Sequence, residues 1–258
     1  MTSEKAATAQ SNKFKKRFVS PKACKSEPEV SILPCVLHYN IVKVRQIVYH
    51  KHKLYIAMDC AMDTLEDVFE TVRVGTRVRF TDERIRGYMM DIMEGVHAIH
   101  SKLYMHCDIN PENILRFDNK RLKIGDFGSA QVIANEERLH SYEGARSYRA
   151  PELTLGSLSY TEAVDIFACG CILAEFFLLE PIFQAKTSKE IFMAQCKILG
   201  TPSEEDWPEG YILADSDDFD IPYYPRNEPV ADRLMALIPE ISPQCADLLS
   251  KMLEFNPK

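Results

Sequence analysis

The stretch that decides the fold is His106-Cys-Asp-Ile-Asn-Pro-Glu-Asn-Ile-Leu115, near the middle of the chain. Ten residues further on comes Asp126-Phe-Gly128, and Ala150-Pro-Glu152 follows. Any one of these pieces alone is typical of a loop rich in polar turn residues. The three together, in this order and at this spacing, form a far more specific pattern.

Composition narrows the classes of protein to which the chain can belong. It has 258 residues, 46% hydrophobic and 27% charged, as in ordinary soluble globular proteins. That length predicts one large domain or two lobes that share a cleft. The 31 basic and 38 acidic residues give a net charge of −7, which argues against direct binding to nucleic acid.

Neither a membrane span nor a secreted protein is indicated. The longest apolar run, 167–183, is interrupted by Glu175 and is shorter than a membrane-spanning helix. The eight cysteines are scattered and no signal peptide precedes them, so we expect a reduced, intracellular protein in the nucleus or cytoplasm. His97 and His100 lie three residues apart without a nearby third metal ligand, and are predicted to be structural.

The periodicity predicts an α+β chain. Two runs rich in β-branched and aromatic residues, 41–49 and 53–58, are predicted to form a hairpin. Thr81 is suited to cap a helix, and a second, buried helix is expected at about 161–179. A short strand is expected at 121–125, and the remainder reads as helices broken by proline. The apolar face of the first helix comprises Ile85, Met89, Ile92, Val96 and Ile99.

The three central pieces resemble the catalytic loop, the metal-binding triplet and the Ala-Pro-Glu motif of eukaryotic protein kinases. The resemblance extends from about residue 27 to the end of the chain. Several later segments of the chain are similar to those of the cyclin-dependent-kinase-like (CMGC) branch. They are residues 149–152, 165–170, 181–183, 198–208 and 248–253.

A rival resemblance competes within the kinases. Residues 107–109, 126–131 and 143–152 are also similar to the replication-initiating cell-division-cycle kinase, which needs a regulatory subunit. Both resemblances imply the same α+β architecture, a two-lobed protein-kinase fold with a truncated β-rich N-lobe and a helical C-lobe. We therefore expect a basic polar tail at 1–12, a shortened N-lobe at 13–60 and a C-lobe at 61–258.

The resemblance implies ATP and Mg²⁺ as cofactors and assigns the residues of the transfer site. Asp108 is the catalytic base that orients the acceptor hydroxyl, and Asn110 stands at the position of the catalytic lysine. Asn113 and Asp126 hold the metal with oxygen ligands. Phosphoryl transfer needs little covalent help but requires alignment and charge neutralisation, and these residue types supply both.

On the nucleotide side the resemblance implies an ion pair and a hinge. Glu29 matches the glutamate of helix C, and Lys16 is the preferred partner lysine, with Lys15 and Lys25 as alternatives. A solvated basic tail is the other interpretation of this stretch, whose lysines and arginine at 13–17 also suit nuclear import or a partner. If the hairpin leads into a hinge at Asp59-Cys60-Ala61, Met58 lies at the back of the nucleotide pocket, a place that also suits a core methionine.

Several family features are missing. No glycine occurs before Gly75, so the glycine-rich loop over the ATP phosphates is absent. Cys107 replaces the arginine that reads an activation-loop phosphate, and a neutral thiol cannot make charge-assisted bonds to phosphate. Asn110 and Ala145 replace a lysine and a threonine that belong to one interaction. Glu152 is expected to lack the arginine partner that the family places after residue 258.

The family residues that are kept and those that are missing support two different functions. The first is a serine/threonine protein kinase in cell-cycle or replication control, which keeps Asp108, Asn113 and Asp126. The second is a pseudokinase that serves as a binding or scaffold module, since a fold does not guarantee its activity. Expected partners are protein substrates and a regulatory subunit, either cyclin-like or an activator of the replication kinase. Tyr142 is either a modified activation-loop tyrosine or a packed aromatic.

Overall fold

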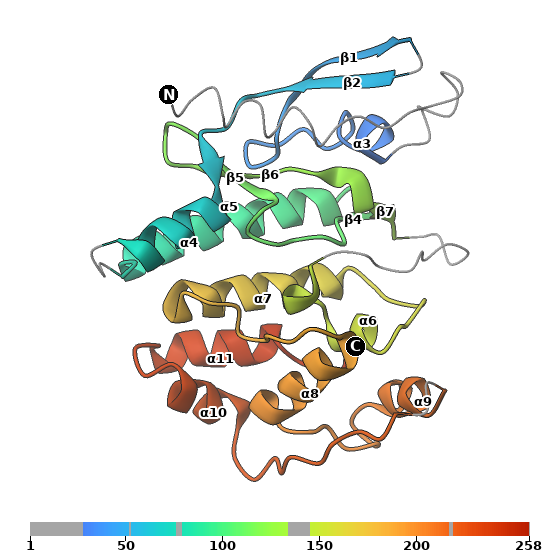
Figure 1. The fold of residues 1–258 in the computed structure, drawn as a ribbon, viewed down its shortest axis with the longest axis vertical. Helices are drawn as coiled ribbons and strands as arrows, with labels where there is room; N and C mark the ends of the chain where they lie inside the picture. The colour runs from blue at the N-terminus through green and yellow to red at the C-terminus, as the bar shows by residue number, and fades with distance from the viewer. Residues whose placement is uncertain (1–27, 52, 76–78, 134–144, 217–218, 258) are drawn as a thin grey trace.

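The computed structural model describes residues 28–51, 53–75, 79–133, 145–216 and 219–257. These form a small upper part built on a β-hairpin and a larger helical lower part, as the sequence predicted (Figure 1). In chain order the helices and strands are α3 (Pro28–Ser31), β1 (Val44–His50), β2 (Lys53–Met58), β3 (Asp63–Thr64), α4 (Leu65–Val74), α5 (Asp82–His100), β4 (Tyr104–Met105), β5 (Ile114–Arg116), β6 (Leu122–Ile124), η1 (Phe127–Ser129), β7 (Gln131–Val132), η2 (Arg146–Tyr148), α6 (Pro151–Thr154), α7 (Ala163–Leu178), α8 (Ser188–Leu199), α9 (Pro208–Ser216), α10 (Val230–Leu237) and α11 (Pro243–Met252).

The predicted hairpin is present as the antiparallel pair β1–β2. It turns at Lys51, whose backbone is left-handed with φ of 46°. Most of β1 is exposed, and the described residues place only a small apolar cluster beneath the hairpin, formed by Leu54 with Val30, Tyr49 and Ile56. The described upper part is therefore thin and buries little apolar surface of its own.

The segment that precedes β1 is bonded to the lower part. The Val42 N–H donates to the Ile124 carbonyl at 2.9 Å, and the Ile124 N–H donates to the Asn40 carbonyl at 2.8 Å. Helix α5 approaches this junction at Gly95, where an added Cβ would lie 2.8 Å from the Ile124 side chain. The absence of a side chain at Gly95 thus lets helix, strand and upper part meet.

Helix α5 begins where the sequence predicted. The Thr81 side chain accepts a hydrogen bond from the Arg84 N–H at 3.3 Å, which is the N-cap geometry, and acidic residues occupy the first turn. Its apolar face is buried, with Met89 only partly covered. The fully buried members of that face are Ile85, Ile92, Val96 and Ile99.

Aromatic packing joins α4 and α7 to the segment just before α5, which carries Phe80. Phe69, Phe80 and Phe176 meet edge to face, with ring centroids 5.0–5.7 Å apart. Helix α7 is buried nearly all round, as predicted, and α11 packs against it at Gly170. Across the described residues, no helix is both long and apolar enough to cross a membrane.

The strand register brings distant loop residues together. β5 pairs antiparallel with both β3 and β6, and Ile114 lies opposite Ile124. The residue before β5 and the residues after β6 therefore emerge at the same end of this small sheet. Those residues are Asn113, Gly125 and Asp126, which belong to the central pieces of the sequence pattern.

The close approach of α7 and α11 predicts how Gly170 tolerates substitution. A Cβ at Gly170 would lie 2.9 Å from Leu253 Cδ2 and 3.0 Å from Met252 Cβ, so Gly170→Ala should destabilise the fold by about 1–3 kcal/mol through overpacking. Gly87 lies on the exposed face of α5 with no atom near its Cβ position, so Gly87→Ala should stabilise the fold by roughly 0.5–1 kcal/mol. Urea unfolding of the three proteins measures both changes, and equal effects of the two substitutions would contradict the packing argument.

Candidate active site

The loop that carries Asp108 is held by one buried carboxylate of α7. Asp165, 1% exposed, accepts the N–H groups of His106 and Cys107 at 2.8 and 2.9 Å, and His100 Nε2 lies 2.9 Å from the same carboxylate. Cys107 has a left-handed backbone, with φ of 63°, which a non-glycine residue rarely adopts. Asp165 therefore fixes the loop in a conformation that its own sequence does not favour.

His106 joins this loop to the Asp126 triplet. The Asp108 N–H donates to His106 Nδ1 at 3.2 Å, so the opposite nitrogen, Nε2, carries the proton and donates to the Gly125 carbonyl at 2.9 Å. The imidazole also meets the buried Phe127 ring edge to face, with centroids 4.9 Å apart. One neutral imidazole thus ties the two central pieces of the pattern together.

The Asp108 carboxylate is held by three N–H donors. Oδ1 accepts from Asn110 Nδ2 at 2.9 Å and from the Ala145 backbone at 3.3 Å, while Oδ2 accepts from Asn113 Nδ2 at 2.8 Å. The structure therefore brings together Asp108, Asn110 and Asn113, as the sequence predicted. A carboxylate fixed in this way is oriented before any acceptor arrives.

Asn110 also shapes the loop itself. Its Oδ1 accepts the N–H groups of Glu112 and Asn113, at 3.0 and 3.2 Å, and so closes the turn after Asp108. In the structure Asn110 thus supports Asp108 and the backbone. A lysine could not accept these two bonds, because its side chain has donors only.

Asn113 and Asp126 emerge at the end of the β5–β6 pair and offer oxygen ligands. The Asn113 amide nitrogen bonds Asp108, which leaves its carbonyl oxygen as the group available to a cation. Asp126 has a left-handed backbone, with φ of 55°, and its carboxylate accepts the Gly128 N–H at 3.3 Å. Oxygen donors of this kind are those that Mg²⁺ prefers, so the residues present fit the predicted metal.

The predicted hinge connects the hairpin to the lower part. Met58 ends β2 and packs against the main core, and the Asp59 N–H donates to the Lys43 carbonyl at 3.1 Å. The Asp59 carboxylate also pairs with Arg45, whereas Cys60 is exposed. These positions agree with a connecting segment, and their contact with a nucleotide stays a prediction.

Other predicted positions lie outside the described residues. Lys16 and its alternatives Lys15 and Lys25 are among them, and so is Tyr142. The backbone of Glu29 belongs to α3, but its side chain is not described. The predicted lysine–glutamate pair therefore stays a prediction.

Cys107 and Glu152 behave as the sequence indicated. Burial raises the pKa of the Cys107 thiol, so this residue is neutral where the family carries an arginine. Glu152 is 5% exposed, and in the part of the chain that the structure describes its Oε1 has no hydrogen-bond partner. Burial raises the pKa of Glu152 to about 7.

The chain is similar to known proteins in both sequence and fold. The model of the protein kinase domain matches residues 3–258, and the chain belongs to the protein kinase family. This confirms the kinase fold that the three central pieces predicted.

Its relatives indicate the branch within that family. The rat serine/threonine-protein kinase ICK is 33% identical over 246 residues, covering 95% of this chain and 38% of the relative. The rice cyclin-dependent kinase F-3 is 35% identical over 249 residues, covering 95% and 54%. The cyclin-dependent-kinase-like prediction is thereby supported, and the replication-kinase rival is not confirmed. The chain spans about half or less of the length of these curated relatives.

A solved structure has a similar fold. The chain is similar to one in the structure of the CAK complex of Chaetomium thermophilum bound to ATP-gamma-S, with a TM-score of 0.78 and 29% identity. The match covers 93% of this chain and 73% of the other.

The raised pKa of Glu152 predicts a pH dependence. The folded state holds this proton more tightly than the unfolded state, so Glu152 lowers stability progressively as pH rises from about 4.5 to about 7. Glu152→Gln should therefore match the parent at pH 4.5 and exceed it by up to roughly 3 kcal/mol at pH 8.

Urea unfolding at the two pH values measures this difference, with the exposed Glu205→Gln as the control that should change neither. A variant less stable than the parent at pH 8 would show instead that Glu152 is charged and paired with a cation.

Proposed function

We propose that the chain is a serine/threonine protein kinase that transfers the γ-phosphate of ATP to hydroxyl groups of protein substrates. The observation that carries the proposal is the Asp108 carboxylate, held by Asn110, Asn113 and the Ala145 N–H beside Asp126 at the end of the β5–β6 pair. An oriented carboxylate next to oxygen ligands for a cation is the arrangement that phosphoryl transfer requires.

In the proposed reaction Asp108 accepts the proton of the acceptor hydroxyl. The hydroxyl oxygen forms the new bond to the γ-phosphorus, the bond between that phosphorus and the β–γ bridging oxygen breaks, and ADP leaves. The three N–H donors keep the Asp108 carboxylate in one orientation, so little reorganisation is needed when the acceptor binds. His106, which belongs to the loop that carries Asp108, donates to the Gly125 carbonyl and so fixes this loop against the Asp126 triplet.

ATP and Mg²⁺ are the proposed cofactors. The similar solved structure is described as bound to ATP-gamma-S, which supports ATP. Asn113 Oδ1 and the Asp126 carboxylate would hold Mg²⁺, whose charge neutralises the phosphates when it is bound. Met58, Asp59 and Cys60 would line the adenine side.

The missing family features predict slow chemistry. Asn110 brings no positive charge to the position of the catalytic lysine, and the loss of one such preorganised charge costs about 10²–10³ in rate. The pseudokinase alternative draws on the same features. It gains no support from the comparisons, because the similar proteins named above are themselves kinases.

A regulatory subunit and an intracellular location belong to the same proposal. The hairpin rests on a small cluster around Leu54 and leaves most of β1 exposed, which a regulatory subunit could cover. The similar solved structure is described as a complex, which supports a regulatory partner. The described cysteines are free, as in a reduced nuclear or cytoplasmic protein. A role in cell-cycle control is proposed by analogy with the cyclin-dependent relative.

The proposed base predicts the behaviour of Asp108→Asn. An amide cannot take the hydroxyl proton, so transfer should fall at least about 10²-fold while the unfolding temperature stays nearly unchanged. The measurement is phosphate transfer by protein purified with its native partners, beside the exposed control Asp118→Asn. Equal transfer by the parent and Asp108→Asn, or none by either, would contradict the proposed activity and favour a scaffold.

The position of Asn110 predicts opposite effects on rate and stability. Asn110→Lys should raise kcat about tenfold or more, because it restores a positive charge near the transferred phosphate. It should also lower the unfolding temperature, because the Glu112 N–H loses its side-chain acceptor and the Asn113 N–H keeps only the Asn110 backbone carbonyl. Kinetics and thermal unfolding test this beside the exposed Asn119→Lys, which adds the same charge elsewhere. A lower kcat would show that support of Asp108 outweighs the missing charge.

A further inference from the structure

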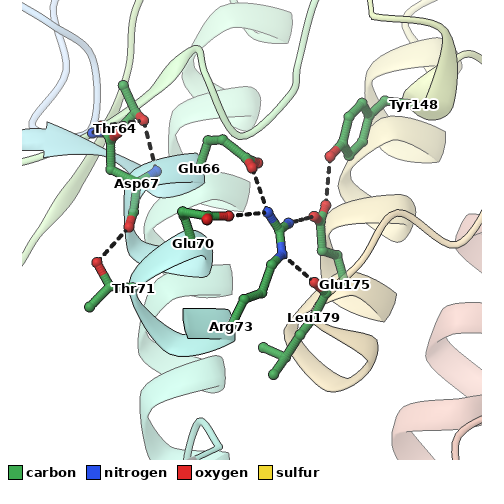
Figure 2. Close-up of polar contacts among 9 residues, drawn as sticks. All are labelled: Thr64, Glu66, Asp67, Glu70, Thr71, Arg73, Tyr148, Glu175 and Leu179. Carbon is green, nitrogen blue, oxygen red and sulfur yellow. Dashed lines mark hydrogen bonds and ion pairs between the residues drawn. The ribbon is translucent and has the colours of Figure 1, made fainter. Parts of the chain in front are cut away.

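The strongest polar cluster outside the transfer site surrounds Glu175 on α7. This carboxylate is 0% exposed, and a buried charge is tolerated only when it is paired and hydrogen-bonded. Oε1 lies 2.9 Å from Arg73 Nη2, and Oε2 accepts the Tyr148 O–H at 2.6 Å. Figure 2 shows Arg73 and Tyr148 on opposite sides of Glu175, so this carboxylate joins α4 to η2.

Arg73 is held in a single orientation by its surroundings. Nη1 donates to Glu66 at 2.7 Å and to Glu70 at 3.3 Å, both on α4, and Nε donates to the Leu179 carbonyl at the end of α7 (Figure 2). The planar guanidinium thus uses all three nitrogens, which a lysine could not reproduce. The guanidinium is partly buried, with 26% of the side chain exposed, so these contacts are only partly screened by solvent.

The start of α4 is fixed against the loop that carries Asp108. Thr64 and Asp67 form a capping box, with the Asp67 N–H donating to the Thr64 hydroxyl at 3.1 Å (Figure 2). The N–H of the preceding residue, Glu66, donates to the Pro111 carbonyl at 3.2 Å. Arg73 therefore extends from a helix that is itself attached to the candidate active site.

The other end of the cluster reaches Asp108. The Tyr148 N–H donates to the Ala145 carbonyl at 3.2 Å and closes the turn η2, and the Ala145 N–H donates to the Asp108 carboxylate. The anchor on Glu175 and the contact with Asp108 thus belong to the same turn. A shift of Tyr148 would displace the Ala145 N–H from Asp108.

We propose that Arg73 is a positioning residue for the acceptor side of the active site, acting through Glu175 and Tyr148 on the segment 145–148. Arg73 contacts neither Asp108 nor the metal ligands, so it acts on the site through its neighbours. The contact with Glu66 leads to Pro111, whereas the contact with Glu175 leads through Tyr148 to the segment 145–148. This inference rests on the proposed kinase activity. It assigns to α4 a function in holding the protein substrate, separate from the binding of nucleotide.

A kinetic comparison separates positioning from general stability. The acceptor peptide is first selected from a serine/threonine library with the parent protein. Arg73→Met should lower kcat/KM for this peptide by about 10- to 100-fold, because small displacements near the reacting groups slow the transfer. The KM for ATP should stay unchanged. The matched control is Arg79→Ala, since Arg79 also donates to the end of α7, at the Phe177 carbonyl, and pairs with the exposed Glu240 without touching Glu175.

A double-mutant cycle tests the route through Tyr148. Tyr148→Phe removes only the O–H that bonds Glu175, so it should reproduce the loss in Arg73→Met, and the double variant should lose no more than either single one. If Arg73→Met does not fold, Arg73→Lys, which keeps one charge, replaces it in the same cycle. Additive losses, an unchanged acceptor kcat/KM, or an equal loss in Arg79→Ala would overturn the proposal.

Amide hydrogen exchange tests the same link without any activity. Arg73→Met should accelerate exchange in residues 145–150 and leave residues 104–110 protected, whereas Arg79→Ala should change neither segment. Absence of transfer by the parent protein would contradict the proposed kinase function alone. In that case unchanged exchange at 145–150 in Arg73→Met would still overturn the positioning link, and faster exchange would support it.

Discussion

The Asp165 carboxylate, buried on α7, accepts the N–H groups of His106 and Cys107 and contacts His100. The left-handed backbone at Cys107 persists only because this carboxylate holds it, since such conformations are costly outside glycine. Everything beyond that point in the loop, including the direction of Asp108, depends on the anchor. The buried helix α7 and the loop that carries Asp108 are thus one unit.

Much of the fold was predictable, because its signals are local. The helix that begins at Thr81 has a capping residue, early acidic residues and an apolar face at helical spacing, and all three are present in α5. The hairpin was predicted from its composition, although β1 begins at Val44 rather than at residue 41. Residues 40–42 bond β6 instead of β2, a long-range pairing that no local pattern specifies.

The candidate site was predictable as far as its motifs reach. Asp108, Asn110 and Asn113 lie close in sequence and meet in space, and the register of β5 and β6 brings Asp126 to the same end. The part that Arg73 and Glu175 play was not predictable, because the two residues are 102 positions apart and neither lies in a recognised motif. Nor did the sequence indicate that Asn110 would support Asp108 with one end of its amide and the backbone with the other.

The neutral thiol at Cys107 has a consequence for signalling. The loop beside it is ordered by contacts with Asp165 and His106, and these contacts form without phosphorylation of the chain. Position 107 therefore offers no cation to which a phosphate added elsewhere on the chain could bind. The geometry of this loop is therefore fixed when the chain folds.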